Sequence, residues 1–335
     1  MKIRAALHSI PGKCAVLLVL LILLAGSMFL SLRLGALNLS LTQIAEVLWN
    51  RTGGIHYQIL YNIRLPRILA GALVGAGLAV SGAILQGVMR NPLAAPGIIG
   101  VSSGGGLAGI LVLLALPQYS ILLVPAAFLG ALVTALLVYL LAWKQGVSPV
   151  RLILAGVAVA AMLGALSSAI LLFNAEKAGG VLDFTIGSLT ARSWKHLHLS
   201  GWYLLAGLAG SFLFSEKLNI LALGDEAARG LGLHVERVRF FFIAVAALLA
   251  AAAVSIAGLL GFVGLIAPHM VRIFIGSDNR FLLPGSAMFG AFLVTACDTV
   301  GRLAIQPSEL PAGIIMALLG PPFFLWLLRG YRYEA

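Results

Sequence analysis

Apolar runs long enough to cross a lipid bilayer recur along the whole length of this 335-residue chain. A transmembrane helix needs about 20 consecutive apolar residues, and helices suit a membrane because they satisfy their own backbone hydrogen bonds. Only 10% of the residues are charged, whereas a soluble domain has about 25%. The sequence therefore predicts an all-α polytopic membrane protein.

We expect one transmembrane domain over residues 1–335, with about ten helices. The first apolar run is long and is followed by many others, so we interpret it as an uncleaved span and not as a signal peptide. An even number of spans places both termini on the same side. The expected spans are 14–32, 64–86, 94–116, 119–142, 150–173, 197–215, 238–257, 259–275, 282–303 and 310–329.

The net charge of +11 fits this topology. Most of the 22 Lys and Arg residues fall on the side of the two termini, and such an excess marks cytoplasmic loops. The positive charge therefore predicts cytoplasmic termini and does not indicate a nucleic-acid partner. Cys14 and Cys297 lie in apolar runs without metal-ligand spacing, so we expect small membrane-buried side chains and no metal site.

The stretch 64–106 combines two apolar runs rich in Gly and Ala with a break between them. Proline disfavours helical backbone in the residue before it, so Asn91-Pro92 should end the first helix. Gly71 and Gly75 allow close approach of neighbouring helices. In lipid, such a break survives only where protein or a water-filled cavity satisfies the freed backbone. This segment therefore belongs inside the bundle, beside a path through it.

Two segments between spans are expected to form short helices. Residues 180–193 are amphipathic and too short and polar to span, which predicts a helix on the outer face. Residues 224–232 begin with Asp225 and Glu226, acids that favour a first helical turn. Gly230 and Gly232 can end that helix. It should lie on the cytoplasmic face.

Several sequence features of other protein classes are missing. No GxxxxGK[ST] occurs, so the chain has no nucleotide-binding loop of its own, and HExxH and GxSxG are absent too. Ion-coupled carriers keep ionisable residues near the bilayer centre. Here the nearest case is Asp298 and Arg302, one turn apart at the outer end of a span, where they can pair. A secondary transporter and an intramembrane enzyme remain as weaker alternatives.

A set of ordered motifs resembles the permease subunits of bacterial ABC importers for iron–siderophore complexes, haem and cobalamin, the type II importers. The resemblance covers nearly the whole chain. Its motifs are RLPR (64–67), SGAILQGVMRNPLAAPGIIG (81–100), RLILAGVA (151–158), GSL (187–189), LALGDEAARGLG (221–232), GFVGLIAPHMVR (261–272), LLPGS (282–286), DTVGR (298–302) and ELPAGIIMALLGPPFFLWLL (309–328).

The resemblance implies a type II importer permease fold in the bacterial cytoplasmic (inner) membrane. It also implies a partner permease, either a second copy or a paralogue, two cytoplasmic ATPase subunits and an external substrate-binding protein. ATP and Mg would be bound by the ATPase, and this chain would be non-catalytic and bind no cofactor. A siderophore is the first expectation for the cargo, then haem, with cobalamin as the alternative.

Residue roles are also implied by the resemblance, each with a plainer alternative. Docking to the binding protein is implied for Arg64, Arg67 and Arg302, which could instead snorkel to headgroups. Contact with the ATPase is implied for a second group, which could instead form an ordinary loop: Gly224, Asp225, Glu226, Ala227, Arg229, Leu231 and Gly232. A gate and pathway role is implied for a third group, for which helix-break structure or packing is the alternative: Asn91, Leu93, Pro149, Val150, Met162, Ser167 and Ser168.

Overall fold

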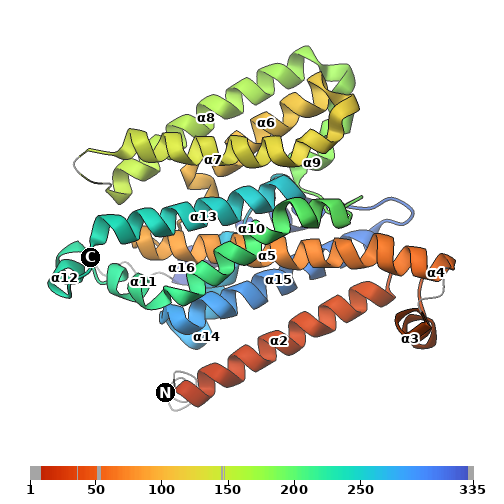
Figure 1. Cartoon of the computed structure of the whole chain (residues 1–335), viewed down its shortest axis with the longest axis horizontal. Coiled ribbons are helices and arrows are strands. Elements are labelled where there is room, and N and C mark those ends of the chain that lie inside the picture. The colour runs from red at the N-terminus through yellow and green to blue at the C-terminus, as the bar shows by residue number, and fades with distance from the viewer. Residues whose placement is uncertain (1–8, 36, 51–53, 145, 147, 331–335) are drawn as a thin grey trace.

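The computed structural model describes residues 9–35, 37–50, 54–144, 146 and 148–330, and these form a bundle of helices without any strand (Figure 1). Every expected span corresponds to a helix. They are α2 (Ile10–Arg33), α5 (Leu65–Met89), α6 (Val101–Ala115), α7 (Leu123–Ala142), α8 (Pro149–Phe173), α10 (Trp194–Leu213), α13 (Val235–Ala257), α14 (Val263–Ile275), α15 (Asn279–Ala304) and α16 (Ala312–Gly330).

These helices differ in whether they could cross a bilayer alone. Six are long and apolar enough, and α10 with α11 (Ser215–Ala222) makes a seventh, bent by 60°. The helices α6, α14 and α16 are shorter in their apolar parts. The first two of these follow irregular segments, and the short 3-10 helix η2 (Pro96–Ile99) precedes α6. Within the described residues, ten helices therefore match the predicted spans in position, but three of them have apolar parts too short to cross a bilayer alone.

The second expected span begins earlier than predicted. The helix α4 (Ile55–Tyr57) continues through a π-helical segment, η1 (Gln58–Arg64), into α5. Tyr57 and Tyr61 stack with ring centroids 5.3 Å apart, and Leu60 is buried against its neighbours. This packing extends the helix into a region that the sequence suggests is a loop, because tertiary contacts outweigh local polarity.

The centre of the bundle is formed by α5 and α13, whose apolar spans are 83% and 78% buried. Glycines allow this packing. A Cβ on Gly82 would lie 1.9 Å from the carbonyl oxygen of Gly264 on α14, and one on Gly75 would lie 2.2 Å from that of Gly290 on α15. These backbones therefore touch directly, as close helix packing in membranes requires. In contrast, only 17% of the α2 span and 11% of the α8 span are buried.

Two opposite ends of the bundle carry the polar segments (Figure 1). One end, the α12 end, has α11, α12 (Asp225–Gly230) and the start of α2. The other, the α3 end, has α3 (Leu41–Asn50), α4 and α9 (Leu182–Ile186). The terminal residues 1–8 and 331–335, on which the prediction of cytoplasmic termini partly rests, lie outside the described residues.

The expected helix over 180–193 is only partly present. The chain forms a 3-10 segment, η4 (Ala175–Val181), then α9, and is non-helical from Gly187 to Ser193. Gly187 has a φ of 92°, which stops the helix. Its carbonyl accepts the N–H of Gly313 at 2.9 Å, and the N–H of Ser188 donates to Ala257 at 2.8 Å. The segment is therefore non-helical because its backbone groups bond to the end of α13 and to the start of α16 instead of to one another.

Candidate functional site

A charge cluster lies at the α3 end, where the start of α5 meets the end of α15. The Arg67 guanidinium donates through Nε and Nη2 to the two carboxylate oxygens of Asp298, at 2.9 and 2.8 Å. Its third nitrogen, Nη1, donates to Glu309 at 2.8 Å. Two parallel bonds of this kind are the strongest geometry that a guanidinium and a carboxylate can adopt. Arg67 therefore joins α5 to α15 and to the α15–α16 loop.

Arg302 and Arg64 extend this cluster toward α2. The Nε of Arg302 is 3.4 Å from Asp298, so the pairing expected from their spacing is confirmed, but Arg67 is the closer partner. Arg302 also donates to the hydroxyl and carbonyl of Ser31. The Arg64 guanidinium donates to carbonyl groups at the end of α2 and beyond it, those of Leu32, Arg33 and Leu37.

Burial shows what these three arginines do in the isolated chain. Arg64, Arg67 and Arg302 are 5–7% exposed, and each donates hydrogen bonds within the chain. Glu309, at 37% side-chain exposure, is the accessible member of the cluster. Sequence reasoning missed Glu309, although its position beside the Leu-Pro that starts the last span was visible. The arginines thus hold α2, α5 and α15 together beneath the surface.

Arg192 lies in the loop beside the cluster and is half-buried. Burial lowers the pKa of its guanidinium to about 10, with Asp183 opposing the shift and the charge of Arg67 adding to it. Its Nη1 is 3.5 Å from Nε2 of His196. Arg192 remains protonated at neutral pH and adds positive charge near the surface of the α3 end.

At the α12 end, the chain forms a short exposed helix. Gly224, with a φ of 110°, turns the chain into it, and Gly232, with a φ of 79°, turns the chain out. Asp225 accepts a hydrogen bond from buried Arg239 at 2.6 Å, and Ala228 is fully buried. One face of α12 is thus fixed to α13.

The opposite face of this helix is exposed, although Arg229 on it lies 3.7 Å from the Glu236 carboxylate of α13. Glu226, Ala227, Arg229 and Leu231 are exposed, Leu231 by 63%. The structure therefore divides the predicted ATPase contacts into two groups. Asp225 is an anchor within the chain, whereas the exposed residues form an outward face that combines an apolar group with both charges.

Two of the predicted gate residues, Asn91 and Leu93, lie at the break after α5, and the other two lie at the start of α8. Arg90 ends the helix in a left-handed conformation with a φ of 49°, and the Asn91 carboxamide accepts the N–H of Leu93 at 2.9 Å. Both Leu93 and Val150 are exposed, Val150 by 66% at the start of α8. Pro149, beside it, is the first residue of α8.

The break and α8 are connected through η2. A Cβ on Gly156 of α8 would lie 1.6 Å from the carbonyl oxygen of Ile98. Further along α8, Met162 and Ser168 are exposed, whereas the Ser167 hydroxyl donates to the Leu163 carbonyl at 2.9 Å. The pathway residues therefore lie on a helix with an open face, and the break packs against its first half.

In the described ranges, no group of three or more His, Cys, Asp or Glu side chains could hold a metal ion. Cys14 is exposed, and Cys297 is buried with its sulfur 3.5 Å from that of Met316.

Comparison with known proteins gives the family. The model of the FecCD transport family matches residues 20–330. The chain is 39% identical to the Fe(3+)-citrate import system permease protein YfmE of Bacillus subtilis, over 93% of this chain and 94% of that protein. It is also 39% identical to the hemin transport system permease protein HmuU of Yersinia pestis, with 95% of each chain covered.

Two further matches extend the range. The cobalamin import system permease protein BtuC of Halobacterium salinarum is 45% identical over 83% of this chain and 75% of that protein. A solved metal-chelate type ABC transporter, in an inward-facing conformation, matches with a TM-score of 0.85 and 33% identity, over 95% of this chain and 99% of that one. The ordered motifs, the helical bundle and these matches agree, and the chain belongs to the FecCD transport family.

Proposed function

We propose that this chain is the membrane-spanning permease subunit of a bacterial ABC importer, moving an iron chelate from an external binding protein into the cytoplasm. Its relatives are named as permeases of ferric citrate, hemin and cobalamin import systems. The observation that carries the proposal is α12, a helix with one anchored and one exposed face on a chain without a nucleotide-binding loop. The energy source is therefore a separate subunit, which binds ATP and Mg.

The coupling step follows from how α12 is held. Its fixed face is tied to α13 through Asp225 and Arg239, and α13 is at the centre of the bundle. A movement that pushes on Glu226, Arg229 and Leu231 is thus passed to the core helices and not absorbed by a loose loop. Under this proposal the α12 end faces the cytoplasm, where two ATPase subunits dock. The start of α2 lies at the same end of the bundle (Figure 1), so it would face the cytoplasm too.

The α3 end then faces the binding protein. Arg64, Arg67 and Arg302 are buried and bonded within the chain, and a partner carboxylate reaches Arg67 only by replacing an internal one. Glu309 is the replaceable partner because it is the exposed member of the cluster. We infer that a carboxylate of the binding protein takes its place beside Arg67, with Arg192 adding attraction at long range. Such charges act mainly on the association rate.

The path for the cargo is proposed to lie along α8. Its exposed face presents small and apolar residues, including Met162 and Ser168, and only 11% of its span is buried in the single chain. A second permease, identical or paralogous, would cover this face and complete a path lined by both α8 helices. The break at Asn91 and Leu93 and the start of α8 at Pro149 and Val150 would close that path at the cytoplasmic end.

The cargo class rests on the relatives. We propose a ferric siderophore first, then haem, with cobalamin as the alternative. A wall of weakly polar side chains suits large chelates that are passed on without tight binding. This chain needs no cofactor of its own for that task.

The experiment is reconstitution of the complete importer in lipid nanodiscs, with ATP hydrolysis measured as loaded binding protein is added. We expect stimulation in the wild type and its loss in Glu226→Lys. The matched control, Glu216→Lys, reverses an exposed charge on α11 at the same end and should retain stimulation. Equal stimulation in all three proteins would refute the assignment of α12. Hydrolysis-independent transport would favour an ion-coupled carrier instead.

A further inference from the structure

Glu236, in the first turn of α13, contacts two segments to which the proposed function gives separate tasks. One is α12, the helix on which the ATPase would act. The other is the connection between α7 and α8, which leads to Pro149 and Val150 at the start of α8. Figure 1 shows the end of α7, the start of α8 and the start of α13 together at the α12 end.

The Glu236 carboxylate is linked to both ends of α12. Arg239, whose side chain is 3% exposed, donates to Asp225 at the start of α12 at 2.6 Å and to Glu236 at 3.2 Å. Arg229, in the last turn of α12, lies 3.7 Å from the same oxygen of Glu236. A displacement of α12 therefore also displaces the positive charges that hold this carboxylate.

The same carboxylate lies against the backbone of the α7–α8 connection. A Cβ on Gly146 would lie 3.1 Å from Oε1 and 3.5 Å from Oε2 of Glu236. Gly146 is buried, and its φ of 115° is a conformation that favours glycine. Because Gly146 has no side chain, the carboxylate approaches the chain itself, and no flexible group separates the two.

The connection is bonded in turn to the first turn of α8. Arg151, in that turn, donates to the carbonyl of Gly146 at 2.9 Å and to that of Lys144 at 3.1 Å. Its Nε donates to the hydroxyl of Ser148, the N-cap of α8, at 3.1 Å. Gly146 and the start of α8, with Val150 exposed on it, should therefore move as one unit.

The end of α7 is held separately from the start of α8. The ring of Tyr139 on α7 packs edge-on against that of Phe240 on α13, with the centroids 5.3 Å apart. This contact keeps the end of α7 beside α13. A movement of the start of α8 relative to α13 is thus taken up in the α7–α8 connection, which is where Glu236 makes its contact.

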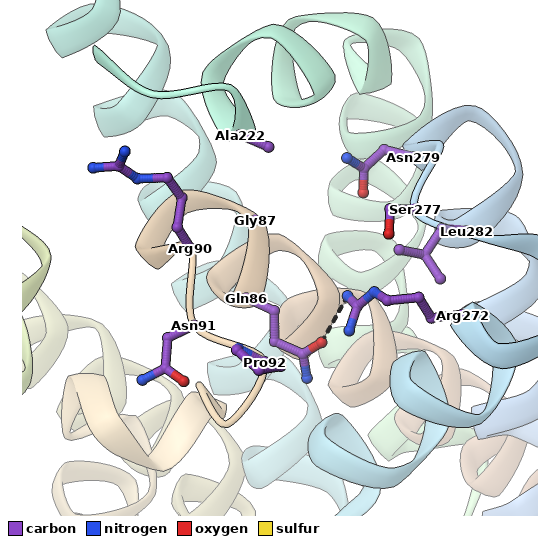
Figure 2. A pocket seen from close by; sticks show the side chains of 10 residues that line it. All are labelled: Gln86, Gly87, Arg90, Asn91, Pro92, Ala222, Arg272, Ser277, Asn279 and Leu282. Atoms are coloured by element: carbon purple, nitrogen blue, oxygen red, sulfur yellow. Dashed lines mark hydrogen bonds between the residues drawn. The ribbon is translucent and has the colours of Figure 1, made fainter. Parts of the chain in front are cut away.

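A second contact between α12 and the gate is looser. The break after α5 borders a cavity, and Figure 2 shows the Arg90 side chain directed away from Gln86 in the lining of that cavity. A terminal nitrogen of Arg90 lies 3.0 Å from where a Cβ on Gly224, at the turn into α12, would be. Arg90 is exposed, whereas Arg239 is buried. The contact through α13 is therefore the firmer of the two.

We propose that Glu236 is a positioning residue that transmits the displacement of α12 to the start of α8 and thereby sets the gate. This inference rests on the proposed function and adds to it the residue that joins the coupling helix to the gate. When the ATPase acts on α12, the arginines of α12 and α13 shift the carboxylate against Gly146. The hydrogen bonds of Arg151 then transmit the shift to Val150.

The test uses the complete importer in lipid nanodiscs, with Val150→Cys as the reporter and with Cys14→Ser and Cys297→Ala to remove the native cysteines. The rate at which a charged maleimide modifies this chain is measured without nucleotide and after trapping with ATP and vanadate. In this parent protein, we expect the two rates to differ. Substitutions within a network that couples two sites change the coupling by about 2- to 30-fold. Glu236→Gln should therefore reduce the ratio of the two rates about fivefold, while stimulated ATP hydrolysis stays within about twofold of the parent.

The matched control is Glu216→Gln, which removes an exposed acid on α11 at the same end and should leave the ratio of rates unchanged. Glu236→Asp keeps the charge and should restore most of the response, which a purely structural role for the longer side chain would not predict. A ratio in Glu236→Gln equal to that of the parent would overturn this inference and leave the proposed function standing.

Two other results would also overturn it. If Glu236→Gln abolishes stimulated ATP hydrolysis, the residue acts in docking or in the folding of α12 and not between α12 and the gate. If the parent itself shows equal rates with and without nucleotide, the start of α8 is not a gate. In that case this part of the proposed function fails together with the inference.

Discussion

Replacing Asp298 by Asn tests the charge cluster most severely. The Asp298 side chain is 4% exposed and accepts the bidentate pair from Arg67, whose side chain is 8% exposed. Removing one partner of a buried ion pair costs about 3–5 kcal/mol. Arg67 keeps Glu309, and Arg302 keeps Ser31. We therefore expect the lower end, a loss of about 3 kcal/mol in the free energy of unfolding.

The assay is equilibrium unfolding in mixed detergent micelles, compared with Glu309→Gln as the control. Because Glu309 is 37% exposed, its loss should cost no more than about 1 kcal/mol. A double variant, Arg67→Met with Asp298→Leu, should be less harmful than Asp298→Asn because the buried Arg67 charge is removed together with its carboxylate partner. Arg302 loses Asp298 in both variants and keeps Ser31 in both. The reasoning fails if Asp298→Asn and Glu309→Gln are destabilised equally, or if the double variant is the worst of the three.

Three other perturbations have defined outcomes. Gly82→Ala should lower the unfolding free energy by about 1–3 kcal/mol or prevent folding, measured in the same assay, whereas Gly164→Ala, with open space around it, should be neutral. Leu231→Asp should leave basal ATP hydrolysis of the complex intact but abolish its stimulation by loaded binding protein. The pKa of Asp278 is lowered to about 2, so its carboxylate contributes fully to the free energy of unfolding above its usual pKa. This contribution should shrink as the pH falls below about 4. Asp278→Asn should therefore flatten the dependence of the unfolding free energy on pH in that range.

Local sequence predicted the helices because run length and breakers act over short range. The ten apolar runs, the break at Asn91-Pro92 and the glycines that bound α12 were all visible in the chain. The Asp298–Arg302 pair was visible too because one helical turn separates the residues. Family membership also followed from ordered motifs, and the comparisons confirm it.

Partners far apart in the sequence could not be predicted in this way. Arg67 and Asp298 are 231 residues apart, and their pairing depends on α5 lying beside α15. The non-helical course of the chain after Ile186 depends likewise on Ser188 bonding to the end of α13. The burial of Arg64, Arg67 and Arg302, for which the resemblance implies docking to a binding protein, was not predictable either. Residue type and position at a span end do not tell which neighbouring helix supplies an acid.

The central claim is that this chain moves its cargo only when an ATPase acts on α12. The most direct measurement is uptake of radiolabelled ferric siderophore, haem and cobalamin into vesicles containing the chain with its cognate ATPase and partner permease, supplied with loaded binding protein. We predict that one chelate accumulates only when ATP is supplied on the side of the membrane that carries the ATPase. No chelate should accumulate when the ATPase is omitted or vanadate is added. Uptake at the same rate without ATPase or nucleotide would contradict the account.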